Sequence, residues 1–119
     1  MRDHRKLEVY HLAEDLLVDV YRVTVAYPVA ERYGLQSQAR RAAVSVVTNV
    51  AEGSARRSSA EYCRFLEVAF GSAREVEVVL RVSLRLGMLD PGAATALADR
   101  YGVVQGMLAN ILKAINPKP

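Results

Sequence analysis

Apolar and small side chains recur every three or four positions between Leu7 and Tyr27, which is the spacing of a helix with one buried face. The stripe consists of Tyr10, Ala13, Leu17, Val20, Thr24 and Tyr27, widened by Leu16 and Val23. Pro28 disfavours helical geometry in the residue before it, so we expect the first helix to end there. The segment 29–34 is then a connection.

A second apolar segment, from about Ser37 to Ala51, is not confined to one face of a helix. Its apolar residues are Ala39, Ala42, Ala43, Val44, Val46, Val47, Val50 and Ala51. The β-branched run 44–50 would also suit a buried strand, but no other segment offers a strand to pair with it, so we predict a helix. Such a helix must be covered on nearly every side, and we expect a second copy of the chain to cover its outer face. Gly53 is expected to end it.

The longest periodic segment runs from Ser59 to Leu86. Ser58 and Glu61 form a capping box that marks its start, and Gly87 is expected to end it. Its stripe consists of Tyr62, Phe65, Ala69, Ser72, Val76, Val79, Ser83 and Leu86, thickened by Leu66, Ala73 and Leu80. The predicted length of this helix is roughly 42 Å. Small residues near its middle would let another helix approach closely.

The last segment begins with Asp90 and Pro91, a capping carboxylate followed by proline at the first helical position. Its stripe consists of Leu97, Tyr101, Val104, Leu108, Ile111 and Ile115. Four helices, short turns and no strand predict an all-α, up-and-down four-helix bundle, with residues 1–119 as a single domain. The valines expected to face another copy, and so to form a homo-oligomer interface, are Val44, Val47, Val78 and Val82.

Composition agrees with a folded intracellular domain. Of the 119 residues, 51% are hydrophobic and 24% are charged, and no apolar run approaches the ~20 residues that a membrane span needs. The only cysteine, Cys63, cannot form an internal disulfide, and it is expected to be a buried, inert thiol. No secretory signal is recognisable at the N-terminus. We therefore expect a cytoplasmic protein.

The net charge of +3 is concentrated in residues 28–58, which carry five positive and two negative side chains. The candidate nucleic-acid-binding residues are Arg40, Arg41, Arg56, Arg57 and Arg64. Guanidinium groups match phosphate oxygens, but no aromatic residues interleave these arginines, so contact without base stacking or sequence readout is predicted. The alternative is that Arg40 or Arg41 pairs with Glu52 or Glu61 and has a structural role.

No constellation of acid, base, nucleophile or phosphate loop is recognisable, so we expect neither an enzyme nor a cofactor. His4, Glu8, His11 and Asp15 share one helical face, but a di-iron bundle needs its Glu-x-x-His motif twice, so a metal site is not expected. Asn49 and Glu52 are interpreted as structural. The stripe of Arg74, Arg81 and Arg85 with Glu77 is interpreted as a solvated face.

The segment 31–75 closely resembles the small four-helix-bundle proteins encoded in intervening sequences of bacterial large-subunit ribosomal RNA genes. The matching positions include Tyr33-Gly34-Leu35, Ser37-Gln38, Arg40-Arg41-Ala42, Asn49, Ala51-Glu52-Gly53, Arg57-Ser58, Phe65-Leu66 and Gly71-Ser72-Ala73. Val47 departs from the pattern, since the family often has proline there, which predicts a less kinked second helix.

This resemblance implies a bundle that assembles into a ring, with a homopentamer as the family type. The family includes the accessory variability determinant of diversity-generating retroelements, and that branch implies a basic surface that binds RNA or DNA and a reverse transcriptase. Two hypotheses follow: an oligomeric module that binds nucleic acid or a nucleic-acid enzyme, or a structural module that binds another protein.

Overall fold

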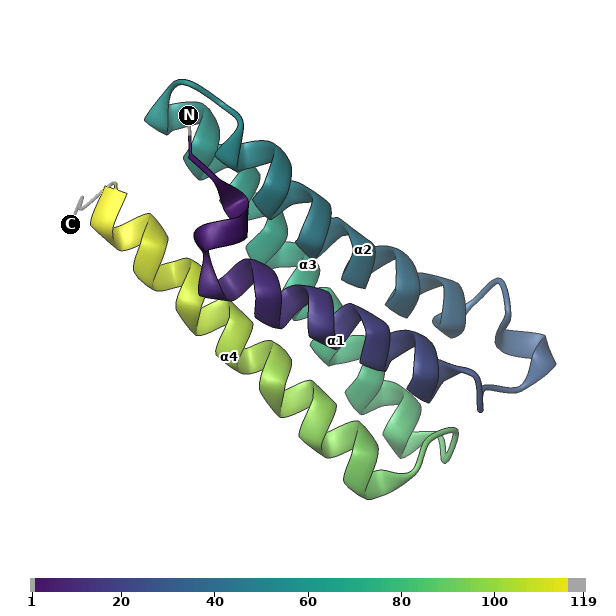
Figure 1. Ribbon diagram of the computed structural model, residues 1–119. Coiled ribbons are helices and arrows are strands. Elements are labelled where there is room, and N and C mark those ends of the chain that lie inside the picture. The colour runs from purple at the N-terminus through teal and green to yellow at the C-terminus, as the bar shows by residue number, and fades with distance from the viewer. Residues whose placement is uncertain (1, 116–119) are drawn as a thin grey trace.

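The computed structural model describes residues 2–115, and it is a bundle of four helices with no strand among those residues (Figure 1). The helices are α1 (Glu8–Thr24), α2 (Leu35–Ser54), α3 (Ser59–Arg85) and α4 (Pro91–Ile115). Two short 3-10 turns, η1 (His4–Lys6) and η2 (Val29–Glu31), precede α1 and α2. Successive helices run in opposite directions, so the predicted all-α four-helix fold is confirmed.

The α2–α3 turn lies at the same end of the bundle as the start of α1 and the end of α4 (Figure 1). The α1–α2 connection and the α3–α4 turn lie at the opposite end. Helix α3 contacts α2 and α4, and α1 contacts the same two helices from the other side. Helix α1 is therefore diagonal to α3, and every helix buries a face against two neighbours.

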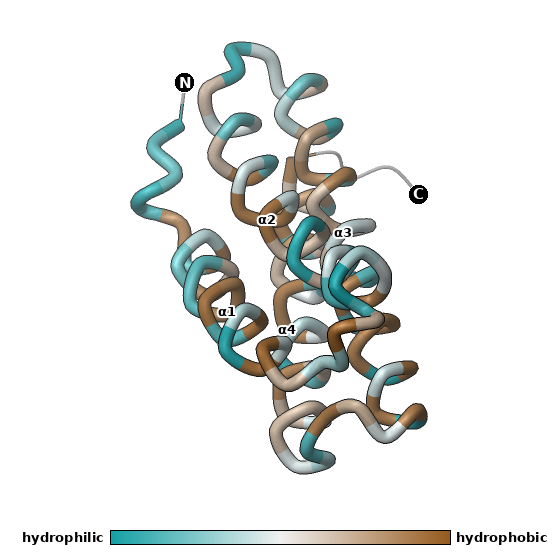
Figure 2. The backbone as a smooth tube through the Cα atoms, turned by 90° about the vertical axis from the view of Figure 1, so that its right-hand side faces the viewer, coloured by the Kyte–Doolittle hydropathy of each residue, from teal (hydrophilic) through white to brown (hydrophobic). Residues whose placement is uncertain are grey.

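The core is built from the predicted stripes, and hydrophobic and hydrophilic bands alternate along the helices (Figure 2). Its largest fully buried side chains are Tyr62, Tyr101, Leu16, Leu66, Leu80 and Leu108. In α1 the buried face is rotated slightly from the predicted one, because α1 lies between α2 and α4: Val9 and Leu16 are buried, whereas Tyr10 and Leu17 are only half-buried.

Helix α1 ends at Thr24, three residues before the predicted end. Tyr27 then turns back into the core, where its hydroxyl donates to Ser83 Oγ at 2.6 Å. Helix α2 begins at Leu35, whose backbone N–H donates to the Glu31 carboxylate at 3.1 Å. A carboxylate at the start of a helix satisfies an otherwise unpaired amide and complements the helix dipole.

The expectation that Gly53 ends α2 is wrong, because the helix continues through Ser54 and Gly53 does not have a positive φ. A Cβ atom at Gly53 would lie 2.7 Å from Phe65 Cβ, so the glycine lets α2 approach α3 closely. Gly87 does cap α3 at φ 75°, with Met88 N–H donating to the Ser83 carbonyl.

Side-chain caps start the two long helices, and at α3 the Ser58 half of the predicted capping box is found. The Ser58 hydroxyl accepts from the Glu61 backbone N–H at 3.1 Å, and the Asp90 carboxylate accepts from the Ala93 N–H at 3.0 Å. These contacts fix where α3 and α4 begin. They also fix the length of the α2–α3 turn, which carries two of the candidate arginines.

Candidate nucleic-acid interface

The structure separates the five candidate arginines into two groups. Arg56 and Arg57 lie in the α2–α3 turn and Arg64 follows in α3, whereas Arg40 and Arg41 lie in the first half of α2. The rise of a helix between Arg41 and the end of α2 is roughly 20 Å. The arginines therefore do not form one cluster, and each group has its own surroundings.

Arg40 is used inside the bundle. Its Nε donates to Thr24 Oγ1 at 2.8 Å, a terminal nitrogen donates to the Tyr21 carbonyl at 3.2 Å, and the guanidinium lies 4.5 Å from the centre of the Tyr21 ring. A cation at the last carbonyls of α1 complements the helix dipole and ties α2 to α1. Arg40 is thus structural, but through α1 rather than through Glu52 or Glu61.

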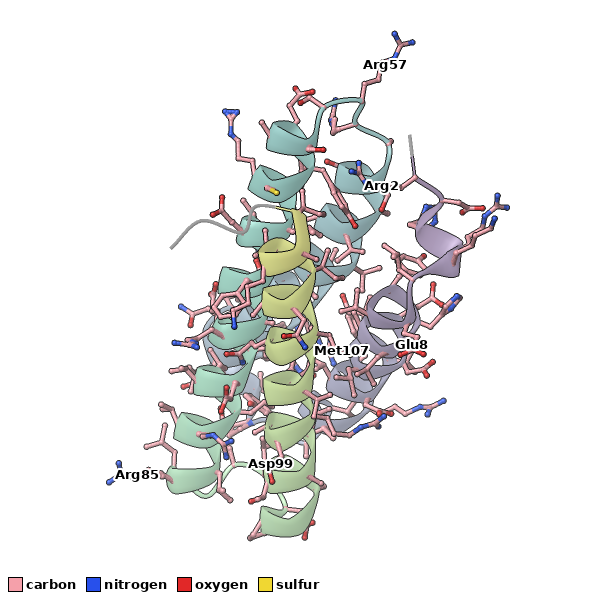
Figure 3. The ribbon with its side chains drawn as sticks, turned by 90° about the vertical axis from the view of Figure 1, so that its left-hand side faces the viewer. Arg2, Glu8, Arg57, Arg85, Asp99 and Met107 are labelled. Atoms are coloured by element: carbon pink, nitrogen blue, oxygen red, sulfur yellow. The ribbon has the colours of Figure 1, made fainter. Side chains whose placement is uncertain are left out.

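The other group stands at the end of the bundle formed by the α2–α3 turn. The Arg57 side chain is exposed and extends away from the helices (Figure 3). Arg64 is exposed on α3, and the Arg56 guanidinium lies 4.7 Å from the centre of the Phe65 ring. Stacking on an aromatic ring holds a guanidinium in place while its outer N–H groups remain available to other acceptors.

The first residues of the chain add a fourth arginine to this end. The Arg2 backbone N–H donates to the Ser54 carbonyl at 2.8 Å, and its guanidinium lies 4.1 Å from the centre of the Tyr62 ring. The Arg2 side chain also donates to Ser59 Oγ at 3.5 Å. Sequence reasoning missed Arg2, because nothing local in the sequence shows that residue 2 contacts residues 54–62.

We define the basic end as Arg2, Arg56, Arg57 and Arg64. None of the salt bridges found among residues 2–115 involves any of these four side chains. The nearby Arg5 is different, because Asp3 accepts from its side chain at 2.9 Å and the resulting hydrogen bond lowers the pKa of Asp3 to about 2. No described carboxylate forms a salt bridge with the four guanidinium groups of the basic end, although Glu61 and Glu67 stand three residues before and after Arg64. Guanidinium groups without such a partner can contact phosphate oxygens.

The stripe of arginines on α3 is not merely a solvated face. Arg74 Nε donates to Gln105 Oε1 at 3.0 Å, and Gln105 Nε2 donates to Glu77 at 2.8 Å. Arg81 bridges Glu77 and Asp99 at 2.8 and 3.0 Å. The Gln105 amide, followed by Arg81, lowers the pKa of Glu77. This network joins α3 to α4 through Arg74 and Arg81, and it includes the predicted pair of Glu77 with Arg81. Arg74 and Arg85 are exposed, as predicted.

Comparison with known proteins now adds the family. Residues 5–110 match the family described as 23S rRNA-intervening sequence protein. The chain belongs to this family. Among solved structures, the protein is similar to one of unknown function from the S23 ribosomal protein family of Bacteroides thetaiotaomicron, with a TM-score of 0.79 and 19% identity. That alignment covers 88% of this chain and 98% of the other, and at this identity it shows a shared fold. No curated protein matches the chain significantly.

Of the four valines predicted to face another copy of the chain, three are exposed in the single chain. Val44, Val78 and Val82 are 37%, 52% and 42% exposed. Val47 instead packs partly against the core. Val68 and Leu86 extend the exposed stripe along α3. Within residues 2–115, no helix is long and apolar enough to cross a membrane.

Two further expectations concern single side chains. Asn49 donates to the carbonyl and the hydroxyl of Ser45 at 2.8 and 3.0 Å, which is a structural arrangement within α2. The expectation that Cys63 is buried is wrong. It is only partly buried, and it lines a cleft of about 450 Å³ between α3 and α4 together with Phe70 and Lys113.

Proposed function

We propose that this protein is a non-enzymatic, self-associating module whose basic end contacts the phosphate backbone of a nucleic acid. The observation that carries the proposal is the convergence of four arginines, from the start of the chain, the α2–α3 turn and α3, none of which takes part in a salt bridge found among the described residues. Phosphate contacts supply most of the affinity of nucleic-acid binding that has no sequence preference.

The geometry of the basic end favours backbone contact over base readout. Arg2 and Arg56 are each held against an aromatic ring, and Arg57 extends from the tip of a turn (Figure 3). The two rings lie under the guanidinium groups, so they are not available for bases. Within residues 2–115, no helix or strand projects from this end to enter a groove, so the predicted contact is electrostatic and depends on salt.

Self-association would multiply this weak contact. The exposed valines on α2 and α3 are the surface that a second copy would cover, and resemblance to the family type suggests a pentamer. An assembly that presents several basic ends to one nucleic acid gains affinity through effective concentration, without new contacts at any one end. The same surface would suit a nucleic acid held by an enzyme such as a reverse transcriptase.

A salt titration tests the proposal. The affinity for a 20-base-pair RNA duplex is measured at two or more salt concentrations for the wild type and for the double variant Arg56→Ala/Arg57→Ala. Each phosphate contact that is lost should reduce the slope of log K against log[salt] by roughly 1. The matched control is Arg32→Ala/Arg85→Ala, which removes the same charge from exposed positions at the opposite end of the bundle. Equal affinities and slopes for the wild type and the Arg56/Arg57 variant would remove the proposal.

A second candidate function, a structural module for another protein, is favoured by the apolar stripe on α3. The stripe combines Val68, Val78, Val82 and Leu86, each at least 42% exposed. If self-association leaves this stripe open, it would suit an apolar partner. Light scattering separates the two cases. A stable oligomer that is lost in Val78→Asp/Val82→Asp assigns the stripe to self-association, whereas an oligomer that persists in this variant, or a wild-type monomer, leaves the stripe to another partner.

A further inference from the structure

A polar cleft lies between α2 and α3 and includes Tyr33 of the α1–α2 connection. That connection is at the end of the bundle opposite the α2–α3 turn (Figure 1). It has a volume of about 480 Å³, within the range of small-molecule sites. The lining residues used below are Tyr33, Gln38, Arg41, Ser45, Ser72 and Glu75. Nothing in the proposed function uses this cleft.

The floor of the cleft is fixed by hydrogen bonds. Ser45 Oγ and Ser72 Oγ lie 2.8 Å apart, joining α2 to α3, and the Asn49 side chain donates to Ser45 Oγ at 3.0 Å. The small side chains at this crossing leave room above them. The floor is therefore polar and already ordered, which lowers the entropy that a ligand must overcome on binding.

Tyr33 stands at the mouth of the cleft and is 89% exposed. It lies on an ordered turn, because Gly34 N–H donates to the Glu31 carbonyl at 3.0 Å and Leu35 N–H donates to the Glu31 carboxylate. The backbone around Tyr33 is therefore held in place, while its ring is exposed to solvent. An exposed aromatic ring on a fixed turn is a surface on which a nucleobase can stack at little entropic cost.

Two opposite charges face the same cleft. Arg41 comes from α2 and Glu75 from α3, and they are not joined by any salt bridge found among residues 2–115. The guanidinium suits a phosphate, and the carboxylate can accept from the exocyclic amino group of a base. Val44 adjoins this cleft, because it lines a groove together with Arg41 and Ser45. Burying the unpaired charges would be costly, so a second copy that covers Val44 is expected to leave the cleft itself open.

The cleft also continues along α2. Arg41 and Ser45 line a second groove of about 350 Å³ together with Tyr21, Val44 and Thr48. Arg41 therefore stands between two hollows, each with an exposed tyrosine beside it. The Tyr21 ring already lies 4.5 Å from the Arg40 guanidinium, so Tyr33 is the ring that a base beside Arg41 can use.

We propose that this cleft binds an unpaired nucleotide of a single-stranded nucleic acid, with the base on Tyr33, the phosphate at Arg41 and the base edge toward Gln38 and Glu75. The inference takes its ligand class, nucleic acid, from the proposed function. It adds a preference for unpaired bases, and bases with an exocyclic amino group, that the basic end does not provide. It also departs from the sequence-based prediction of contact without base stacking.

The test compares a 12-residue oligodeoxycytidine with a 20-base-pair duplex by fluorescence anisotropy. Tyr33→Ala should weaken binding of the single strand about tenfold or more and leave binding of the duplex unchanged. Tyr33→Phe keeps the ring and should bind like the wild type. Glu75→Gln should reduce the preference for oligodeoxycytidine over oligothymidine. Cytidine 5′-monophosphate should shift the amide signals of residues 33–41 and 72–75 in an NMR titration of the wild type.

Several results would overturn the inference: full single-strand affinity in Tyr33→Ala, an equal loss on single strand and duplex, or no shift of the cleft signals by the mononucleotide. The proposed function fails on a different result, a duplex affinity that does not depend on Arg56 and Arg57. If Tyr33 matters for the single strand while Arg56 and Arg57 do not matter for the duplex, the cleft is a site and the basic end is not. If Arg56 and Arg57 matter for the duplex while Tyr33 does not matter for the single strand, the basic end is a site and the cleft is not.

Discussion

Replacing Gly53 by alanine sets two known effects against each other at the close approach of α2 and α3. Within a helix, alanine is favoured over glycine by about 1 kcal/mol. The new Cβ, however, would lie 2.7 Å from Phe65 Cβ and 3.3 Å from Tyr62 Cδ1. A Cβ atom sits on the backbone and cannot rotate away, so the helices must separate, and overpacking of this kind costs about 1–3 kcal/mol. Because the gain and the cost overlap in size, the fixed position of the clashing atom decides the sign.

We therefore expect Gly53→Ala to be less stable than the wild type, by up to about 2 kcal/mol after the helix-propensity gain is subtracted. The matched control is Gly106→Ala in the interior of α4, where nothing lies within 4 Å of the new Cβ. That variant should be more stable by about 0.5–1 kcal/mol. Urea denaturation at equal protein concentrations measures both, since self-association would make stability depend on concentration. If Gly53→Ala stabilises the protein as much as Gly106→Ala does, the close packing of α2 on α3 is refuted.

Two other predictions concern side chains inside the bundle. The Tyr101 hydroxyl is buried without a hydrogen-bond partner within the described chain, so Tyr101→Phe should raise the free energy of unfolding by about 1 kcal/mol, and a loss of stability would contradict this. Burial also raises the pKa of Tyr101 above its ordinary value of about 10. Above pH ~10 the unfolded chain therefore releases the Tyr101 proton more readily than the folded protein does, and the free energy of unfolding falls as the pH rises. Phenylalanine has no such proton, so Tyr101→Phe should unfold less readily than the wild type at high pH. Arg40→Ala should lower the free energy of unfolding by about 1–2 kcal/mol, because it removes the hydrogen bonds to Thr24 and Tyr21. Arg41→Ala should change it by at most about 0.5 kcal/mol. Equal effects of the two substitutions would contradict a structural role for Arg40.

The helices could be predicted because their signals are local. The periodicity of α3, the Ser58 cap and the left-handed Gly87 each depend on residues within one or two helical turns of one another. Gly53 was misread for the same reason, since a glycine near the end of an apolar segment looks like a cap. Only the packing of α3 shows that it is there to admit a neighbouring helix.

The surface could not be predicted in the same way, because its contacts join distant parts of the chain. Arg2 reaches the α2–α3 turn, Arg40 reaches the end of α1, and Gln105 joins Arg74 to Glu77. Sequence alone therefore placed five arginines in one group that the fold divides between the two ends of α2 and the start of α3. The four helices bring Arg2 to the basic end and leave Arg41 beside Tyr33 at the other.

The most direct measurement of the central proposal is amide hydrogen exchange with and without the RNA duplex. Binding through the basic end should slow exchange in residues 54–64, around the α2–α3 turn, and leave the α3–α4 turn at residues 86–90 unchanged. The protection should weaken as salt is added, because the contacts are to phosphates. Protection confined to the α3–α4 turn, or no protection anywhere at a duplex concentration that saturates binding, would contradict it.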